Sequence, residues 1–500
     1  MNKVVIIGSG FAGLSAASFM AKEGWDVTVL EKHNMPGGRA RKFSEEGFTF
    51  DMGPSWYWMP DVFERYFNCF GKKVDDYYFL KRLSPSYRVY YGDGPVNIPS
   101  GYEQLKALFE SLEKGAAKKL DTFLAEAAYK YEVGINKLVH KPGRSLREFI
   151  DLDLAKGVLK LDVFTSMKKH ISKYFKHPKL VQLMEFPVLF LGALPQNIPA
   201  LYSLMNYADI KLGTWYPQGG MYAVVDAMHK LAKELGVKFY FDCEVISIEV
   251  KNFKASGVKA QFMANGKRSA INYFDADVII GAADYHFVES ELLPANCRTY
   301  SEAYWNKRIM APSCLLYYVG LNKKLKNILH HSLFFDVDFD KHGKEIYDHP
   351  QWPGEPLFYV SATSVTDETV SPPGCENLFF LIPVAAGLKG DTAELRDEYF
   401  NKIIRRFEKH TGEKITDNII FKKTYAVSDF VNDYNAYKGN AYGLANTLMQ
   451  TAILKPSVKS KKVKNLFYTG QLTVPGPGVP PSLISGEVVA KEIIKDFNKK

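Results

Sequence analysis

The stretch Val4-Val-Ile-Ile-Gly-Ser-Gly-Phe-Ala-Gly13 decides the fold. Its first four residues, Val4–Ile7, are apolar and β-branched, which is typical of a strand buried on both faces of a parallel sheet. Gly8 permits a tight turn out of this strand, Gly10 lets a diphosphate approach the backbone, and Gly13 lets the following helix pack close to the strand. The stretch therefore predicts the start of a dinucleotide-binding βαβ unit.

The residues after this turn complete the unit. Phe11–Lys22 is expected to form the helix, with Gly24 ending it, and Val27–Leu30 the return strand. The free N–H groups and positive dipole end of a helix N-terminus favour phosphate. Glu31 follows the second strand at the spacing of an acid that accepts hydrogen bonds from an adenosine ribose. A glycine triplet alone is weak evidence, but strand, helix and acid together indicate a dinucleotide.

The segment after Glu31 decides between NAD and FAD. Pro36-Gly-Gly-Arg-Ala40 follows directly, and Phe50-Asp-Met-Gly-Pro-Ser55 comes soon after. Here the sequence resembles the flavin amine oxidase and phytoene desaturase superfamily. The resemblance implies that Gly38 and Arg39 contact the FAD diphosphate, where a planar guanidinium suits two phosphates. It also implies that Gly53, Pro54 and Ser55 approach the isoalloxazine ring.

The C-terminal block Asn465–Ser482 carries the most specific resemblance. It reads Asn-Leu-Phe-Tyr-Thr-Gly470-Gln-Leu-Thr-Val-Pro475-Gly-Pro-Gly-Val-Pro480-Pro-Ser and is similar to the signature of bacterial-type phytoene desaturases. A strand is expected at Asn465–Thr469 and a last helix from about Ser482. In that family the helix N-terminus faces the N1/C2 edge of the flavin, which gains negative charge on reduction.

The resemblance continues along almost the whole chain. It includes the segments Trp215–Met221, 244–246, 282–284 and Asn435–Tyr442. Val474, Gln471 and Asn440 depart from the residues common in the family, so the surroundings of the flavin are expected to differ. The cofactor-binding residues expected here are Gly8, Gly10, Phe11, Ala12, Gly13, Glu31, Lys32, Gly38, Arg39, Gly53, Pro54, Ser55, Val245, Ala283, Gly470, Gln471, Val479, Pro480 and Ser482, with the Val245 backbone at the adenine.

Length and composition restrict the class of protein and its number of hydrophobic cores. Five hundred residues exceed one ordinary core, and apolar and charged contents of 46% and 24% are those of a globular protein. The formal charge of +9 comes without any nucleic-acid motif, and five scattered cysteines favour a reducing, cytoplasmic compartment. The longest apolar run, Phe186–Leu194, is too short to span a bilayer, so any membrane association is expected to be peripheral.

The expected fold class is α/β: a Rossmann-like FAD-binding domain, a mixed-sheet substrate domain and a helical subdomain facing the membrane. Expected elements include strands at Tyr87–Tyr91, Lys238–Val250 and Val278–Gly281, and a helix at Met221–Leu235. The predicted division assigns 1–79, 220–292 and 462–500 to FAD binding, 80–112, 205–219 and 293–461 to the substrate, and 113–204 to the helical subdomain.

The resemblance implies an oxidoreductase that desaturates a long apolar polyene, with phytoene preferred and oxygen or a quinone as electron acceptor. Conjugation would stabilise positive charge on the substrate, so no catalytic base is named. The Lys-rich segment around 155–205 suggests a lid that meets anionic lipid, or an ordinary amphipathic domain.

Other functions remain open. They are a desaturase of a later hydroxylated carotenoid, a carotenoid isomerase, a flavin amine oxidase and a prenyl carrier without flavin. No metal site or G-x-S-x-G hydrolase motif is indicated, since His330 and His331 are adjacent and project differently.

Overall fold

The N-terminal βαβ unit forms as predicted. The computed structural model describes residues 1–500 except 146–147, 149–160, 190, 265–266 and 499–500. Strand β1 (Lys3–Ile7), helix α1 (Phe11–Lys22) and strand β2 (Asp26–Leu30) follow one another, and β1 pairs parallel with β2. They belong to a five-stranded parallel sheet, in the order β19-β13-β1-β2-β9. The other strands are β9 (Lys238–Tyr240), β13 (Val278–Gly281) and β19 (Leu466–Tyr468).

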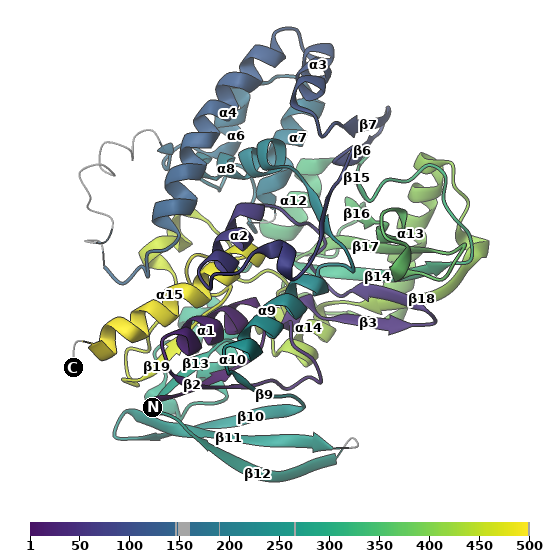
Figure 1. Ribbon diagram of the computed structural model, residues 1–500. Helices are drawn as coiled ribbons and strands as arrows, with labels where there is room; N and C mark the ends of the chain where they lie inside the picture. Colours follow the sequence, from purple (N-terminus) through teal and green to yellow (C-terminus); the bar gives the residue numbers. More distant parts are fainter. Residues whose placement is uncertain (146–147, 149–160, 190, 265–266, 499–500) are drawn as a thin grey trace.

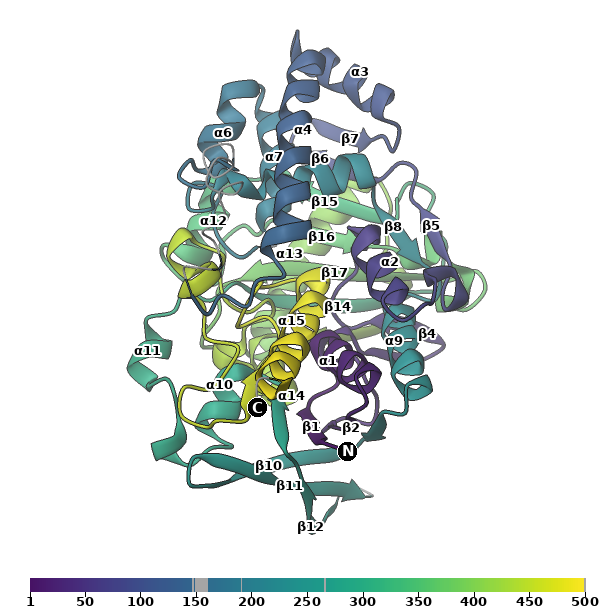
Figure 2. The ribbon, with the colours of Figure 1, turned by 60° about the vertical axis from the view of Figure 1, so that its left-hand side comes forward.

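The two ends of the chain pack against each other. Helix α15 (Val479–Asn498) lies along α1, as Figure 2 shows. The Ser15 hydroxyl donates to the Leu483 carbonyl at 2.7 Å. A Cβ added at Gly486 would overlap the Ala12 carbonyl oxygen, so this glycine permits the close helix contact. Residues nearly 480 positions apart therefore build one layer on the parallel sheet.

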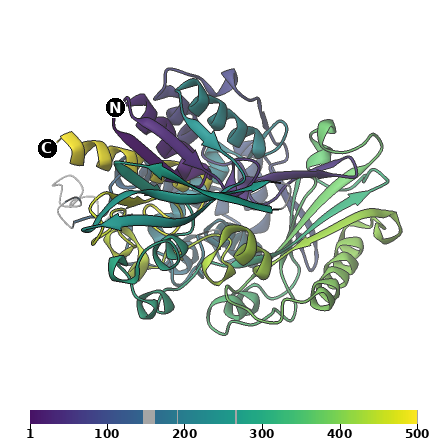
Figure 3. The same ribbon diagram turned by 90° about the horizontal axis from the view of Figure 1, so that it is seen from below.

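A seven-stranded mixed sheet forms the second body of the molecule (Figure 3). Strand β14 (Ser313–Leu321), next to the edge strand β18, is buried over its whole length, and its two faces differ. Tyr317 packs against Phe400 of helix α13 (Ala393–Thr411), with ring centroids 5.1 Å apart. Leu316 points the other way and lines a cavity. The remaining strands are β6 (Tyr87–Tyr91), β7 (Gly94–Ile98), β15 (His331–Phe335), β16 (Phe358–Ser361), β17 (Glu376–Val384) and β18 (Ile419–Tyr425).

A helical region covers one end of this sheet (Figure 1). It contains α3 (Tyr102–Leu112), α4 (Ala116–Val133), α6 (Met167–Tyr174) and α7 (Pro178–Leu189). Lys156 and Lys160, part of the expected basic face, lie outside the described residues. Across the described part of the chain, every helix is too short or too polar to span a membrane. The predicted division into three domains stays a proposal.

Further elements surround these bodies. They are α2 (Pro60–Asn68), α8 (Leu204–Tyr207), α9 (Tyr222–Glu234), α10 (Tyr285–Ser290), α11 (Glu302–Asn306), α12 (Phe339–Tyr347), α14 (Val427–Tyr434), β3 (Lys42–Glu45), β4 (Phe48–Asp51), β5 (Leu80–Arg82), β8 (Trp215–Pro217) and the antiparallel sheet of β10 (Cys243–Lys251), β11 (Lys254–Ala264) and β12 (Lys267–Asp275).

Two sequence predictions need correction. The single strand expected at Lys238–Val250 is wrong, because the chain bends at Asp242 (φ 50°) and passes from β9 in the parallel sheet to β10 in the antiparallel one. The last helix begins at Val479, three residues before Ser482. The Pro480-Pro481 pair seemed to belong to the turn, but proline is tolerated in the first turn of a helix.

Candidate active site

One continuous cavity runs between the two bodies and has two unlike halves. The nucleotide half is lined by the ends of the parallel strands, the turn before α1 and the start of α15. The apolar half is lined by α7, α12 and the inner face of the mixed sheet. The nucleotide half comprises 7–12, 30–33, 37–40, 53–55, 243–245, 282–285, 469–472 and 477–482; the apolar half comprises Trp56, Trp58, Met59, Phe186, Leu189, Leu191, Leu194, Met205, Cys314, Leu316, Leu333, Phe335, Phe339, His342, Gly343, Ile346, Tyr347, 357–359, Leu381 and Pro383.

The N-terminus of α1 opens into the nucleotide half. No side chain caps this helix, and its first turn holds no acidic residue. Gly8 has a φ of +99°, which favours glycine, and a Cβ added at Gly10 would meet nothing within 4 Å. The space beside Gly10 and the uncapped helix N-terminus form a cradle for an anion.

Gly13 has a different role from the other predicted glycines. It does not line the cavity. A Cβ at this position would overlap the carbonyl oxygen of Gly8. This agrees with the packing role expected from the sequence, so Gly13 shapes the site without touching a ligand.

Glu31 lies at the end of β2 with its carboxylate buried beside the cavity. Oε2 accepts hydrogen bonds from the amide and hydroxyl of Ser9, both at 2.8 Å, and Oε1 accepts from the His33 amide at 3.0 Å. A carboxylate has about four acceptor positions. These three donors therefore fix the orientation of Glu31 and leave it capacity for a ligand hydroxyl.

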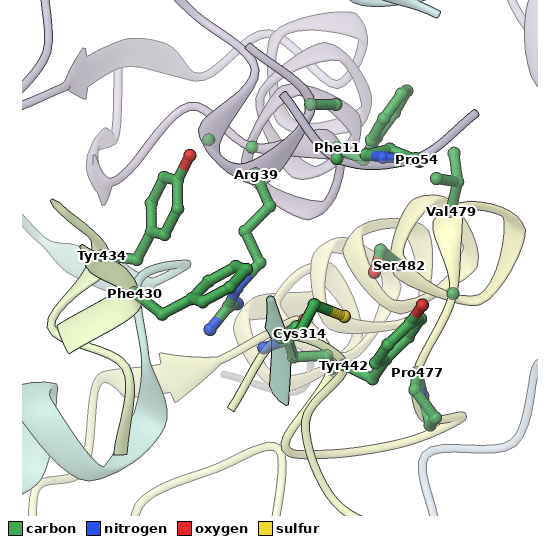
Figure 4. Close-up of a pocket in the computed structure, with 18 of the residues that line it drawn as sticks. Phe11, Arg39, Pro54, Cys314, Phe430, Tyr434, Tyr442, Pro477, Val479 and Ser482 are labelled. Atoms are coloured by element: carbon green, nitrogen blue, oxygen red, sulfur yellow. The ribbon is translucent and has the colours of Figure 1, made fainter. Parts of the chain in front are cut away.

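Arg39 crosses the nucleotide half beside two aromatic rings (Figure 4). One guanidinium nitrogen donates to the Asn440 carbonyl at 3.0 Å, and the Cζ atom lies 5.5 Å from the ring centroid of Tyr434. Its Nε is buried and has no hydrogen-bond partner among the described residues. Burial lowers the pKa of Arg39. An unpaired buried N–H of a cation is costly, and an anionic ligand would satisfy it.

Asp284 is a buried acid whose charge acts on Arg39 and raises its pKa, against the effect of burial. Its carboxylate caps α10 through the Phe287 amide at 3.3 Å and accepts from the Tyr437 amide at 3.2 Å. Burial raises the pKa of Asp284, and the charge of Arg39 acts in the opposite direction. Burial strengthens the electrostatic interaction between these two charges relative to one at the protein surface.

Two of the three departures from the family pattern, Gln471 and Asn440, contact each other. The Gln471 amide donates to Asn440 Oδ1 at 3.2 Å, and the Asn440 carbonyl is the acceptor for Arg39. Gln471 and Asn440 therefore join the C-terminal block to the Gly-Gly-Arg segment. Val474 precedes Pro475, and the peptide bond between them is cis.

The Asp-x-Gly segment connects to the Trp215–Met221 turn. Asp51 accepts from the amides of Met221 at 2.7 Å and Tyr222 at 2.9 Å, and so caps α9. A Cβ at Gly220, where φ is +91°, would lie 2.5 Å from Asp51 Oδ2. Burial raises the pKa of Asp51 to about 6. Asp51 thus holds the loop whose next residues, 53–55, line the cavity.

The start of α15 differs from the expected cluster of free N–H groups. Pro480 and Pro481 have no backbone N–H, and the Ser482 amide already donates to the Gly478 carbonyl at 3.0 Å. Val479 therefore supplies the free amide within this turn. The positive dipole end remains, since it depends on the whole helix.

The apolar half contains no carboxylate or ammonium group among the described residues that line it. Its buried His342 accepts from the Leu357 amide through Nδ1 at 3.0 Å, so Nε2 carries the proton and donates to the Pro383 carbonyl at 2.9 Å. Burial lowers the pKa of His342 to about 4, so the ring is neutral at neutral pH. This half suits a long hydrocarbon.

All predicted site residues except Gly13 line the cavity. Lys32 Nζ donates to the Asn432 carbonyl at 3.0 Å at its rim. Sequence reasoning did not select Phe430, Tyr434 or His342. Tyr434 ends a segment in which no motif was recognised. It lies beside Arg39 only in the folded chain, because the two residues are about 400 positions apart in the sequence. Tyr442 and Asp284 stood in family-like segments, which was the available signal for them.

A polar cluster lies in the helical region. Ligand atoms of Glu126, Asp162 and His170 lie within 4.8 Å of one another, although the sequence suggested no metal site. The Lys130 ammonium is 2.9 Å from Asp162 Oδ2 and places a positive charge there already. We assign no ion to this cluster.

The nucleotide half fits FAD on three structural grounds. It offers an uncapped helix N-terminus, an unpaired buried guanidinium N–H and open space at the Gly10 position. Glu31 retains an acceptor position for a ribose hydroxyl. The assignment of individual residues to parts of FAD stays a proposal.

Comparison with known proteins agrees with this site. The model of the family described as flavin containing amine oxidoreductase matches residues 11–494. A carotenoid 3,4-desaturase of Haloarcula japonica is 41% identical over 496 residues, covering 99% of this chain and 98% of that protein. A zeta-carotene-forming phytoene desaturase of Myxococcus xanthus is 29% identical, with 99% and 94% covered.

The fold is also found among solved structures. An oxidoreductase from Methanosarcina mazei superimposes with a TM-score of 0.61 at 15% identity, covering 98% of this chain and 100% of that one. At that identity the likeness concerns the fold alone. The family match and the 41% identical relative carry the assignment further: this chain belongs to the flavin containing amine oxidoreductase family, in its carotenoid desaturase branch, and is an FAD-dependent oxidoreductase.

Proposed function

We propose that this enzyme introduces a carbon–carbon double bond next to the conjugated part of a carotenoid. The observation that carries the proposal is the continuity of the cavity, which passes from a dinucleotide cradle into a half lined by apolar side chains and one neutral histidine. A cationic amine substrate is stabilised best where a carboxylate lies near its charge. The charged residues that line the cavity, among them Glu31, Arg39 and Asp284, lie instead around the nucleotide half, and the described lining of the apolar half includes no carboxylate.

In the proposed arrangement the chain binds and orients FAD. The α1 N-terminus, Gly38 and Arg39 would hold the diphosphate, Glu31 the ribose and the Val245 backbone the adenine. Residues 53–55, Gly470, Gln471 and 479–482 would surround the ring. Bound FAD supplies a two-electron acceptor for hydride from one carbon, while the adjacent carbon loses a proton. The apolar half then positions the bond and excludes water.

The substrate we favour is a partly conjugated carotenoid that receives its new bond at C3–C4. The 41% identity to a carotenoid 3,4-desaturase supports this choice over the 29% identity to a phytoene desaturase. Desaturation of phytoene, the substrate preferred from the sequence, is the second candidate. Both reactions place the same demand on the apolar half, which is to bind a hydrocarbon along its length.

A direct test uses the FAD-loaded protein with liposomes that carry either phytoene or a conjugated carotenoid with a saturated C3–C4 bond. The favoured substrate should lose two hydrogens by mass and absorb at longer wavelength, and phytoene should react more slowly. Faster conversion of phytoene would reverse the order of the two candidates. An unchanged double-bond count would indicate an isomerase, and peroxide release with polyamines an amine oxidase.

The electron acceptor is proposed to be oxygen or a quinone. Anaerobic assays with and without an added quinone separate the two. Turnover that continues without oxygen when a quinone is present would assign the quinone. Turnover that stops under both anaerobic conditions would assign oxygen.

Substrate entry from a membrane surface is the remaining part of the proposal. Phe164, Met449 and Leu454 are 83%, 71% and 43% exposed. Their segments are neighbours, because the Ala200 amide donates to the Thr165 carbonyl and Tyr202 bonds to Thr451. Lysines of α6 lie nearby in sequence and suit anionic lipid. Flotation with anionic and neutral liposomes tests this, and binding that ignores both lipid charge and salt would contradict it.

A further inference from the structure

Lys455 is a buried lysine with no acidic partner among the described residues. The residue is 5% exposed, and its Nζ has no hydrogen-bond partner among the described residues. Burial alone lowers its pKa to about 7, and no neighbouring charge shifts it. A buried ammonium is costly unless it is paired, so the fold retains this one against its own stability.

A second unsatisfied group lies at the same place. Asn446 is 3% exposed, and its Oδ1 also lacks a partner. A Cβ added at Gly476 would lie 2.7 Å from Asn446 Oδ1 and 3.2 Å from Lys455 Nζ. Both polar groups therefore approach the same glycine, whose φ of +137° and missing side chain make room for them.

Gly476 belongs to the turn that precedes α15. Its neighbours Pro477 and Gly478 line the nucleotide half, whereas Lys455 and Asn446 do not. The ammonium therefore lies behind the cavity wall, on the side of the turn away from the cofactor site. The start of α15 has few free N–H groups of its own, because two of its first three residues are proline. Lys455 places an amino group that can carry a positive charge where hydrogen-bond donors are scarce.

We propose that Lys455, held with Asn446 behind Gly476, is a positioning residue that stabilises the negative charge which the flavin ring gains on reduction. The inference rests on FAD binding as proposed above and deepens it by naming the cation behind the ring. Lys455 acts through the turn and does not touch the substrate. With oxidised flavin the unpaired ammonium loses its proton readily, because burial lowers its pKa, and the reduced ring supplies the counter-charge that keeps it protonated.

The test uses Lys455→Met and Lys455→Gln, which remove the charge, and Lys455→Arg, which keeps it. Lys414→Met is the matched control, since the Lys414 side chain is 89% exposed. Two readouts need no carotenoid: the midpoint potential of bound FAD, and the affinity for sulfite, which adds to oxidised flavin where negative charge on the ring is stabilised. Both readouts are independent of the substrate. An unchanged potential and sulfite affinity would contradict the role of Lys455 without contradicting desaturation, and a changed potential would support that role even if the proposed substrate is wrong.

We expect the neutral variants to retain FAD, to bind sulfite about tenfold more weakly and to have a potential lower by about 30 mV, the two-electron equivalent of a tenfold change. Lys455→Arg should lie near the wild type. Unchanged potential and sulfite affinity in FAD-loaded neutral variants would overturn the proposal. So would neutral variants that fail to fold, or that fold but no longer hold oxidised FAD, because the ammonium would then serve the apoprotein or the oxidised cofactor.

Discussion

The two halves of the cavity recognise their ligands by different means. In the nucleotide half the main chain forms much of the binding surface, at the uncapped α1 N-terminus and at the turns around Gly8 and Gly38. In the apolar half, side chains from distant strands and helices define the surface. A backbone cradle depends on a few positions and fails when one is filled. A side-chain wall spreads its selectivity over many positions, so single changes there should adjust the substrate choice.

The largest effect is expected from Gly13→Ala. The new Cβ would overlap the Gly8 carbonyl, so the backbone of the β1–α1 turn must shift. Overpacking of this kind costs about 1–3 kcal/mol or more, and here the neighbour is main chain that cannot turn aside. We expect a sharp loss of soluble protein and of thermal stability, measured with and without FAD.

Gly10→Ala is the matched comparison for this glycine. The Gly10 backbone (φ −67°, ψ 177°) suits alanine, and its Cβ would meet no atom within 4 Å. The apoprotein should therefore melt as the wild type does, while FAD affinity falls about tenfold because the methyl group occupies the anion cradle. Equal losses of apoprotein stability in both variants would contradict the separate roles.

A smaller effect than that of Gly13→Ala is expected from Arg39→Met, which should lower FAD affinity without preventing folding. Charge-assisted hydrogen bonds contribute about 1.5–3 kcal/mol each, so FAD affinity should fall between tenfold and a hundredfold. Arg39→Lys should recover part of this, because lysine keeps the charge but loses the planar fork. Isothermal titration of the apoproteins with FAD measures both variants. Wild-type affinity in Arg39→Met would remove the guanidinium from the proposed diphosphate site.

Asp51, which holds the loop beside the nucleotide half, and His342, in the apolar half, predict opposite pH dependences of stability. The pKa of Asp51 is raised to about 6, so the folded state holds its proton longer and stability falls as pH rises from about 4 to 6. The pKa of His342 is lowered to about 4, so the unfolded state binds more protons and stability rises with pH from about 4 to 6.5.

Asp51→Asn and His342→Gln should remove these opposite slopes. Urea unfolding at about pH 4.5 and about pH 7 should show changes on the order of 2 kcal/mol, relative to the wild type, with opposite sign. Changes of the same sign in both variants would mean that one of these side chains is more hydrated in the folded state than its burial implies.

The smallest effect is expected in the wall of the apolar half. Ile346 lines the cavity from α12 and is only partly buried, so Ile346→Phe should fold normally. The added ring should shift the choice between phytoene and the longer conjugated substrate by about fivefold, with FAD affinity unchanged. An equal loss for both substrates would indicate general obstruction.

Much of the nucleotide half could be predicted from the sequence because its signals are local. Val4–Ile7, the glycine triplet and Glu31 lie within 28 residues, and their spacing sets strand, turn and acid. The apolar half could not be predicted, because Phe186, Leu316 and His342 are far apart in the sequence and line one cavity only in the folded chain. The bend at Asp242 was missed for the same reason: the change of sheet depends on the strands that pair with β9 and β10.

The partners of Arg39 show the same limit. The motif identified the residue, but Tyr434 and Asn440 come from a segment 400 positions away. The start of α15 was misplaced because a Pro-Pro pair fits both a turn and a first helical turn. The sequence therefore predicts a site when its chemistry lies on one segment, and fails when distant segments supply it.

The contact between α1 and α15 determines when the nucleotide half is complete. Strand β19 forms the edge of the parallel sheet, and α1 packs against a helix that lies more than 460 residues later in the chain. The glycine turn before α1 is thus synthesised hundreds of residues before residues 469–482, which line the same half of the cavity. The nucleotide half is therefore complete only after residues 469–482 have been synthesised.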